Sequence, residues 1–221
     1  ISSGITALVA CIMQVVMNNS LVYYGNQTEI TGDVALSAMG IVMKIAMILA
    51  SVCIGFGIGA QPILGFNLGA KKYTRVRHTY LLAVSIATGS ILIGWAVCQL
   101  APHLVLSLFG KENQTFTDFA VRCLRIYLGG IFCAGFQIVS TNYFQATGQP
   151  LKASLLSMLR QLILLIPLLL ILPIFFGLSG LLYAGPCADI GSAVIVALFI
   201  LPEMRKLNRK IAESQGPALA V

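Results

Sequence analysis

Residues 34–64 read VALSAMGIVMKIAMILASVCIGFGIGAQPIL, and Lys44 is the only charged side chain in this stretch. A helix of about 20 apolar residues is enough to cross a hydrocarbon core about 30 Å thick. A transmembrane strand needs only about 9 to 11 residues and alternates polar with apolar positions, which this stretch does not do. The stretch therefore predicts a transmembrane helix.

The composition of the whole chain extends this prediction. Of 221 residues, 58% are hydrophobic and 10% are charged, and the mean hydropathy is +0.92, whereas about a quarter of the residues of a soluble domain are charged. Soluble enzymes, DNA-binding domains and disulfide scaffolds are excluded on this basis. The six cysteines lie in apolar runs without CxxC or Cys/His spacing, which argues against a disulfide framework or a metal site.

Five further apolar runs are long enough to span a bilayer. The predicted fold is therefore an all-α membrane protein with six transmembrane helices joined by short, Gly-containing turns, over residues 1–202, followed by a basic tail at 203–221. Because residue 1 is Ile rather than Met, we expect the chain to be part of a longer protein. The six predicted spans cover residues 1–24, 34–64, 79–101, 119–146, 155–176 and 181–201.

The basic residues predict how the spans are oriented. Ten of them fall on one side, in the connector after the second span, at the start of the fifth span and in the tail. By the positive-inside rule this side is cytoplasmic, so both ends of the chain are predicted to be cytoplasmic in a plasma (inner) membrane. A nucleic-acid site is not expected, because these charges are spread over three connectors. The ten residues are Lys71, Lys72, Arg75, Arg77, Lys152, Arg160, Arg205, Lys206, Arg209 and Lys210.

Helix-breaking residues lie inside several spans. Pro62, with Gly59 and other glycines around it, is predicted to act as a conformational hinge. The alternative is that the glycines provide a small face for close helix packing.

Polar side chains inside the spans are candidates for a substrate or ion path, because they are costly in lipid. A rise of about 1.5 Å per residue places Lys44 roughly 15 Å and Asp189 roughly 12 Å below the outer surface, with Asn18 and Asn19 at roughly 8 to 9 Å. We therefore expect Lys44 and Asp189 to interact, either as a structural ion pair or with Asp189 available to a coupling cation. The full set of candidates is Asp189, Lys44, Asn18, Asn19, Gln137 and Asn142.

The amides in this set have an alternative role as hydrogen-bonding groups between helices. Soft and aromatic side chains are candidates for a pocket that accepts flat compounds, with simple packing as the alternative. They are Tyr23, Tyr24, Met43, Met47, Tyr127 and Tyr143. Arg160 and Gln161 are predicted to brace the junction between the fourth and fifth spans.

Three segments carry a resemblance to a known family. They are GFGIGAQPILGFNLGAKKYTRV at 55–76, NYFQATGQPLKASLLSMLRQ at 142–161 and LPIFFGLSGLLYAGPCADI at 172–190. In sequence and order they resemble parts of one repeat of the multidrug and toxin extrusion (MATE) family. The context around residues 39–45 and the FNLGAKKY stretch are most similar to its bacterial branch near the staphylococcal drug exporters.

The resemblance implies a fold and a function. Members of that family have two six-helix lobes in an inverted V, and they export cationic or aromatic compounds by alternating access in exchange for sodium or protons. The basic tail makes this chain similar to the C-terminal lobe. Its implied partners are small organic cations or drugs, membrane lipid and the N-terminal lobe of the same polypeptide. The resemblance implies no cofactor, and the coupling cation is sodium or a proton.

One departure from the family pattern bears on ion coupling. The first span offers Gln14, Asn18 and Asn19 but no carboxylate, whereas one sodium-coupled branch has an acid there. The coupling carboxylate is then expected in the absent lobe. A related lipid-linked substrate flippase is the alternative function. An enzyme is not expected, since the sequence lacks HExxH, GxSxG and paired intramembrane acids.

Overall fold

The structure is a computed structural model that describes residues 2–28, 30–109 and 114–215. Over these residues it is entirely helical, without a strand. The start of the first predicted span at Ile1 and the end of the tail at 216–221 lie outside the described residues. The elements are α1 (Ser2–Gly25), α2 (Gly32–Gly69), α3 (Tyr73–Leu100), α4 (Pro102–Ser107), α5 (Gln114–Tyr127), η1 (Leu128–Cys133), α6 (Ala134–Ala146), α7 (Pro150–Met158), η2 (Leu159–Leu165), α8 (Ile166–Phe176) and α9 (Leu178–Gln215).

The described residues contain six helical segments long and apolar enough to cross a membrane, which confirms the predicted fold class. Two of these segments are not α-helical over their whole length. The fourth span passes through a 3-10 turn at η1 between α5 and α6, and the fifth passes through a π-helical turn at η2 between α7 and α8. Each of the two irregular turns packs against α9.

The irregular turns have causes in the sequence. Pro167 has no N–H group, so the helix upstream cannot close its regular bond at that position, and η2 ends two residues before it. In η1, a Cβ atom on Gly130 would lie 2.7 Å from the Cα atom of Pro186. Only glycine therefore allows η1 and α9 to come this close.

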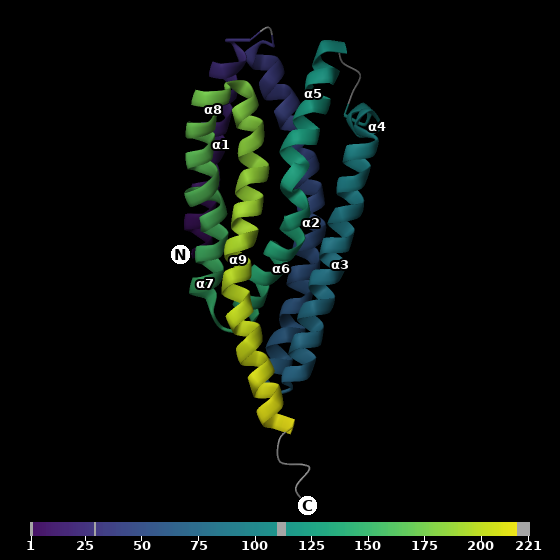
Figure 1. Cartoon of the computed structure of the whole chain (residues 1–221), viewed down its shortest axis with the longest axis vertical. Coiled ribbons are helices and arrows are strands. Elements are labelled where there is room, and N and C mark those ends of the chain that lie inside the picture. Colours follow the sequence, from purple (N-terminus) through teal and green to yellow (C-terminus); the bar gives the residue numbers. More distant parts are fainter. Residues whose placement is uncertain (1, 29, 110–113, 216–221) are drawn as a thin grey trace, which may run out of the picture.

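The helices form one elongated bundle (Figure 1). Helix α2 packs mainly against α3 and α6, while α9 packs against α8, η1 and η2. Large buried side chains, among them Met17, Met39, Leu64, Ile91 and Phe144, fill the space between the helices. At the lower end of Figure 1 the bundle narrows to the ends of α2, α3 and α9.

Two helices extend beyond their predicted spans. Helix α2 continues through Pro62 to Gly69 without interruption, and an added Cβ atom on Gly59 would meet nothing within 4 Å. Helix α9 continues past residue 202 to Gln215, with Leu207 buried against the bundle. The described part of the basic tail is thus a helical extension of the sixth span, and the hinge at Pro62 stays a prediction.

Candidate functional site

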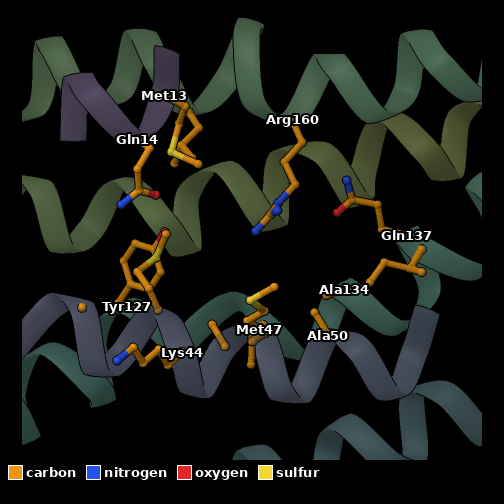
Figure 2. Close-up of a pocket in the computed structure, with 15 residues that line it drawn as sticks. Met13, Gln14, Lys44, Met47, Ala50, Tyr127, Ala134, Gln137 and Arg160 are labelled. Carbon is orange, nitrogen blue, oxygen red and sulfur yellow. The ribbon is translucent and has the colours of Figure 1, made fainter. Parts of the chain in front are cut away.

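The bundle has an open cavity of about 540 Å³ between α1, α2, the α5–η1–α6 segment and η2. Figure 2 shows Lys44, Met47 and Ala50 on one wall and Arg160 reaching in from the opposite wall. Three of the soft and aromatic candidates, Met43, Met47 and Tyr127, line this cavity together with Met13. The cavity therefore combines flexible apolar side chains with a small number of polar groups, as ligand sites commonly do.

Arg160 forms an ion pair with Asp189. The Nη2 atom of Arg160 lies 2.6 Å from Oδ1 of Asp189, and its Nε–H group donates to the same oxygen at 2.7 Å. The side chain of Asp189 is 5% exposed and that of Arg160 is 35% exposed. Arg160 thus neutralises the buried carboxylate while part of its own guanidinium remains at the cavity.

The prediction that Lys44 pairs with Asp189 is therefore wrong. Asp189 lies on α9, which packs against η2, the turn that carries Arg160, whereas α2 packs mainly against α3 and α6. Within the part of the chain that the structure describes, Lys44 has no hydrogen-bond or ion-pair partner, and its side chain is exposed at the cavity wall. The depth estimate treated all helices as regular and straight, so it gave no information on which neighbours face each other.

The predicted role of Arg160 as a brace between the fourth and fifth spans needs the same correction. Arg160 joins η2 to α9. The signal in the sequence was its position inside the fifth predicted span, where a lone cation needs an acidic partner. The structure identifies that partner as Asp189, the only buried acid among the described residues.

A second cavity, of about 570 Å³, shares Ala50, Gln137, Ile138 and Arg160 with the first. Gln137 is buried, and its Oε1 atom accepts a hydrogen bond of 2.9 Å from the hydroxyl of Ser192 on α9. Arg160 and Gln137 therefore lie where the two cavities meet.

Amide side chains line the second cavity. Gln61 donates to Oδ1 of Asn142 at 2.5 Å and to Oε1 of Gln145 at 3.0 Å. These bonds link α2 to α6, which is the hydrogen-bonding role considered as the alternative for the amides. Gln61 was missed in the sequence because it lies beside Pro62, where the expected role was that of a hinge.

The two asparagines of α1, Asn18 and Asn19, have different surroundings in the structure. Asn18 accepts a hydrogen bond of 3.2 Å from Gln14 and lines a small cavity of about 200 Å³. Asn19 is exposed and lines none of these three cavities. The pocket prediction for Tyr143 is also not met, because its ring packs edge-on against Tyr80.

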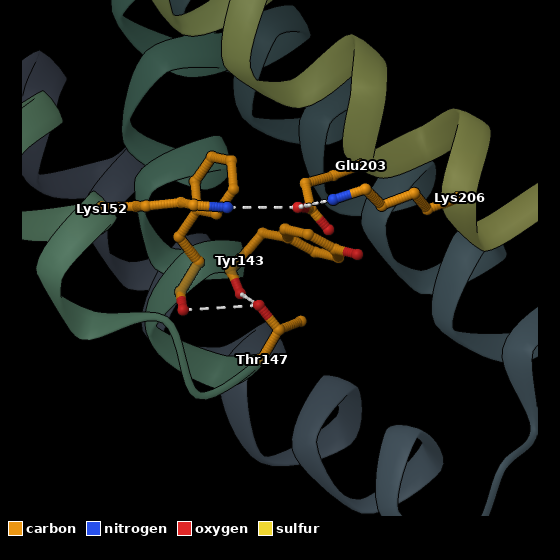
Figure 3. Close-up of polar contacts among 6 residues, drawn as sticks. Tyr143, Thr147, Lys152, Glu203 and Lys206 are labelled. Carbon is orange, nitrogen blue, oxygen red and sulfur yellow. Dashed lines mark hydrogen bonds and ion pairs between the residues drawn. The ribbon is translucent and has the colours of Figure 1, made fainter.

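A second ionic cluster joins α7 to α9 (Figure 3). The Nζ atom of Lys152 lies 3.3 Å from Oε1 of Glu203 and 5.8 Å from the centre of the Phe144 ring. Lys206 also reaches Glu203, at 3.5 Å. This cluster fixes the junction between α6 and α7 to the extended part of α9.

No group of three or more His, Cys, Asp or Glu side chains in the described ranges is arranged to hold a metal ion. The polar groups that come together are instead two cations, one paired acid and several amides, distributed around open cavities between transmembrane helices. The fold and this arrangement define a multi-pass helical membrane protein with open cavities between its helices.

Comparison with known proteins gives the family. The MatE family model matches residues 6–171, and the chain belongs to this family of transporters. The multidrug export protein MepA of Staphylococcus haemolyticus is 27% identical over 206 residues, which are 91% of this chain and 41% of that protein.

Solved structures show the same fold. An inward-facing multidrug resistance MATE family transporter of the MOP superfamily matches 94% of this chain and 47% of its own, with a TM-score of 0.83 and 18% identity. An outward-facing one matches 94% of this chain and 46% of its own, with a TM-score of 0.83 and 19% identity. The chain therefore spans less than half the length of these relatives, which is the size of one lobe.

Proposed function

We propose that the chain is one six-helix lobe of a multidrug exporter that moves cationic or aromatic compounds out of the cell by alternating access. The observation that carries this proposal is the open cavity of about 540 Å³, lined by methionines, Tyr127 and polar groups, in a chain of the MatE family. Methionine and aromatic side chains adapt to ligands of varied shape. A site of this kind suits a transporter of many compounds better than one of a single metabolite.

The rest of the transporter is supplied, in this proposal, by an N-terminal lobe of the same polypeptide. The lobe described here is then the C-terminal one, with its basic helical extension in the cytoplasm. In support, residues that line the larger cavity are exposed in this chain, with Met47 at 74%. The fold also matches the inward-facing and outward-facing transporters equally well, which supports a lobe that moves as one body and bends, if at all, near Gly59 and Pro62.

Coupling to the entry of sodium or protons is part of the proposal. Asp189, the buried acid of the described residues, is already neutralised by Arg160. We therefore assign the main coupling carboxylate to the other lobe, with Asp189 contributing only if Arg160 releases it during the cycle.

The orientation has a direct test. In a cysteine-free version of the complete protein, an impermeant thiol reagent should label Gln114→Cys from outside the cell and Ser214→Cys only from the cytoplasmic side. The reverse pattern would contradict the assignment of both chain ends to the cytoplasm.

Export is tested in cells that make the complete protein. They should accumulate less of a fluorescent cationic dye than cells with an empty vector, and a protonophore or removal of sodium should abolish the difference, according to the coupling ion. Met47→Trp, which fills the cavity, should reduce export, while Ile93→Trp, on the exposed surface of α3, should not. Unchanged accumulation for a panel of cationic and aromatic dyes, with the protein present in the membrane, would reject drug export.

A further inference from the structure

The cavity walls carry an excess of positive charge. Lys44 and Arg160 are the charged residues among the described side chains that line the two larger cavities, and no carboxylate lines either of them. Asp189, which does not line either cavity, neutralises the charge of Arg160 through their ion pair. The charge of Lys44 is therefore left without a counter-charge on this side of the cavity.

Arg160 keeps hydrogen-bonding capacity for a ligand. A guanidinium has five N–H donors in a planar fork, and the contacts to Asp189 use Nε and Nη2 on a single oxygen, Oδ1. The side chain of Arg160 is 35% exposed and lines the cavity, and Figure 2 shows its guanidinium directed into the cavity. Arg160 is thus held in place by Asp189 with donors still available.

Lys44 and Gln137 provide further donors around the same cavity. The Oε1 atom of Gln137 accepts from Ser192, which leaves its amide nitrogen as a donor. Lys44 has no partner in the described part of the chain. An unpaired ammonium surrounded by apolar walls at membrane depth attracts an anion more strongly than it would in water.

We propose that this wall is a subsite for an anionic group, a carboxylate or a phosphate, on an amphipathic compound. Arg160 and Gln137 bind the anionic oxygens, the charge of Lys44 on the opposite wall attracts the anion into the cavity, and the methionines and Tyr127 contact the apolar body of the compound. The proposal rests on the proposed export function and narrows it: among aromatic substrates, this lobe recognises best those that also carry a carboxylate or a phosphate.

The test compares two dyes with the same ring system, a rhodamine ethyl ester and the corresponding free acid, which has a carboxylate where the other has the ester. Binding to the complete protein in nanodiscs of zwitterionic lipid is measured by fluorescence anisotropy. Lys44→Gln should weaken binding of the free acid by about tenfold, because the attraction between its charge and the anion in the cavity is lost, and leave the ester unchanged. Lys72→Gln, which removes the same charge from an exposed connector outside the cavities, should affect neither dye.

Arg160 requires a second variant, because Arg160→Gln alone strands the buried Asp189. The double change Arg160→Gln with Asp189→Asn keeps the shape of the pair without charge, and it should also weaken binding of the free acid selectively. Two results would overturn the subsite. In the first, both variants bind the free acid as tightly as the unchanged protein does. In the second, the variants lose affinity for the ester as much as for the free acid. In both cases the unchanged protein still binds and exports the ester, so the exporter proposal survives. Absence of binding and export for both dyes in the unchanged protein rejects the two proposals together.

The source of the anionic group is separated by adding phosphatidylglycerol to the nanodiscs. If a lipid phosphate fills the subsite, the anionic lipid should lower the free-acid affinity of the unchanged protein more than that of Lys44→Gln. If the subsite takes dissolved carboxylates, the lipid should lower both affinities equally.

Discussion

Two exposed surfaces of the bundle differ in chemistry although both lie at membrane depth. The surface of α3 exposes mainly aliphatic side chains over its central part, including Leu82, Ile86 and Ile93, and no charged side chain. The cavity surface exposes Lys44, Gln14 and part of Arg160 beside its methionines. The exposed residues of the two surfaces therefore suit different surroundings. Those of α3 are suited to lipid, and those of the cavity are suited to water, ligand and a second lobe.

The largest effect is expected from breaking the pair that supports the polar surface. Arg160→Gln leaves the carboxylate of Asp189 buried without a counter-charge, which should lower the free energy of unfolding by about 3 to 5 kcal/mol. Adding Asp189→Asn should restore most of the loss, because the two neutral amides can bond each other. The measurement is the yield and melting temperature of the purified complete protein. If Arg160→Gln is as stable as the unchanged protein, the pair does not stabilise the cavity wall.

A charge placed on each surface sharpens the comparison. Ile86→Arg puts a guanidinium near the middle of α3 against lipid, which should disfavour insertion by about 2.5 to 3.5 kcal/mol. Met47→Arg places the same group at the cavity and should cost far less. The amount of each variant in the membrane fraction tests this, and equal amounts would mean that the two surfaces have the same surroundings.

The ion pair at the far end of the bundle should matter less than the one at the cavity. Lys152 is 44% exposed in its side chain, and Lys152→Met should lower stability by only about 1 kcal/mol, since exposed pairs contribute little. Lys206→Met, at the more exposed partner of Glu203, is the matched control and should have a smaller effect. A loss from Lys152→Met as large as that from Arg160→Gln would contradict the distinction between the two ends, as judged from melting temperatures.

The sequence was enough to predict the six spans, because in lipid the length of an apolar run determines whether a helix crosses. Met43, Met47 and Tyr127, pocket candidates from the sequence, line the larger cavity, whereas Tyr143 from the same set packs against Tyr80. The partner of Asp189 was not predicted, since it depends on which helix packs beside α9 and on the π-helical turn that carries Arg160. Hydropathy gives no information on either.

The most direct test of the account is the accessibility of these two surfaces to water. Met47 is 74% exposed and Ile93 is 71% exposed, so single cysteines at the two positions, in a cysteine-free version of the complete protein, differ in surroundings but not in exposure. A water-soluble thiol reagent should label Met47→Cys, a transported dye should slow that labelling, and Ile93→Cys should remain unlabelled. Labelling of Ile93→Cys with no reaction at Met47→Cys would contradict the assignment of the cavity surface to the transport path.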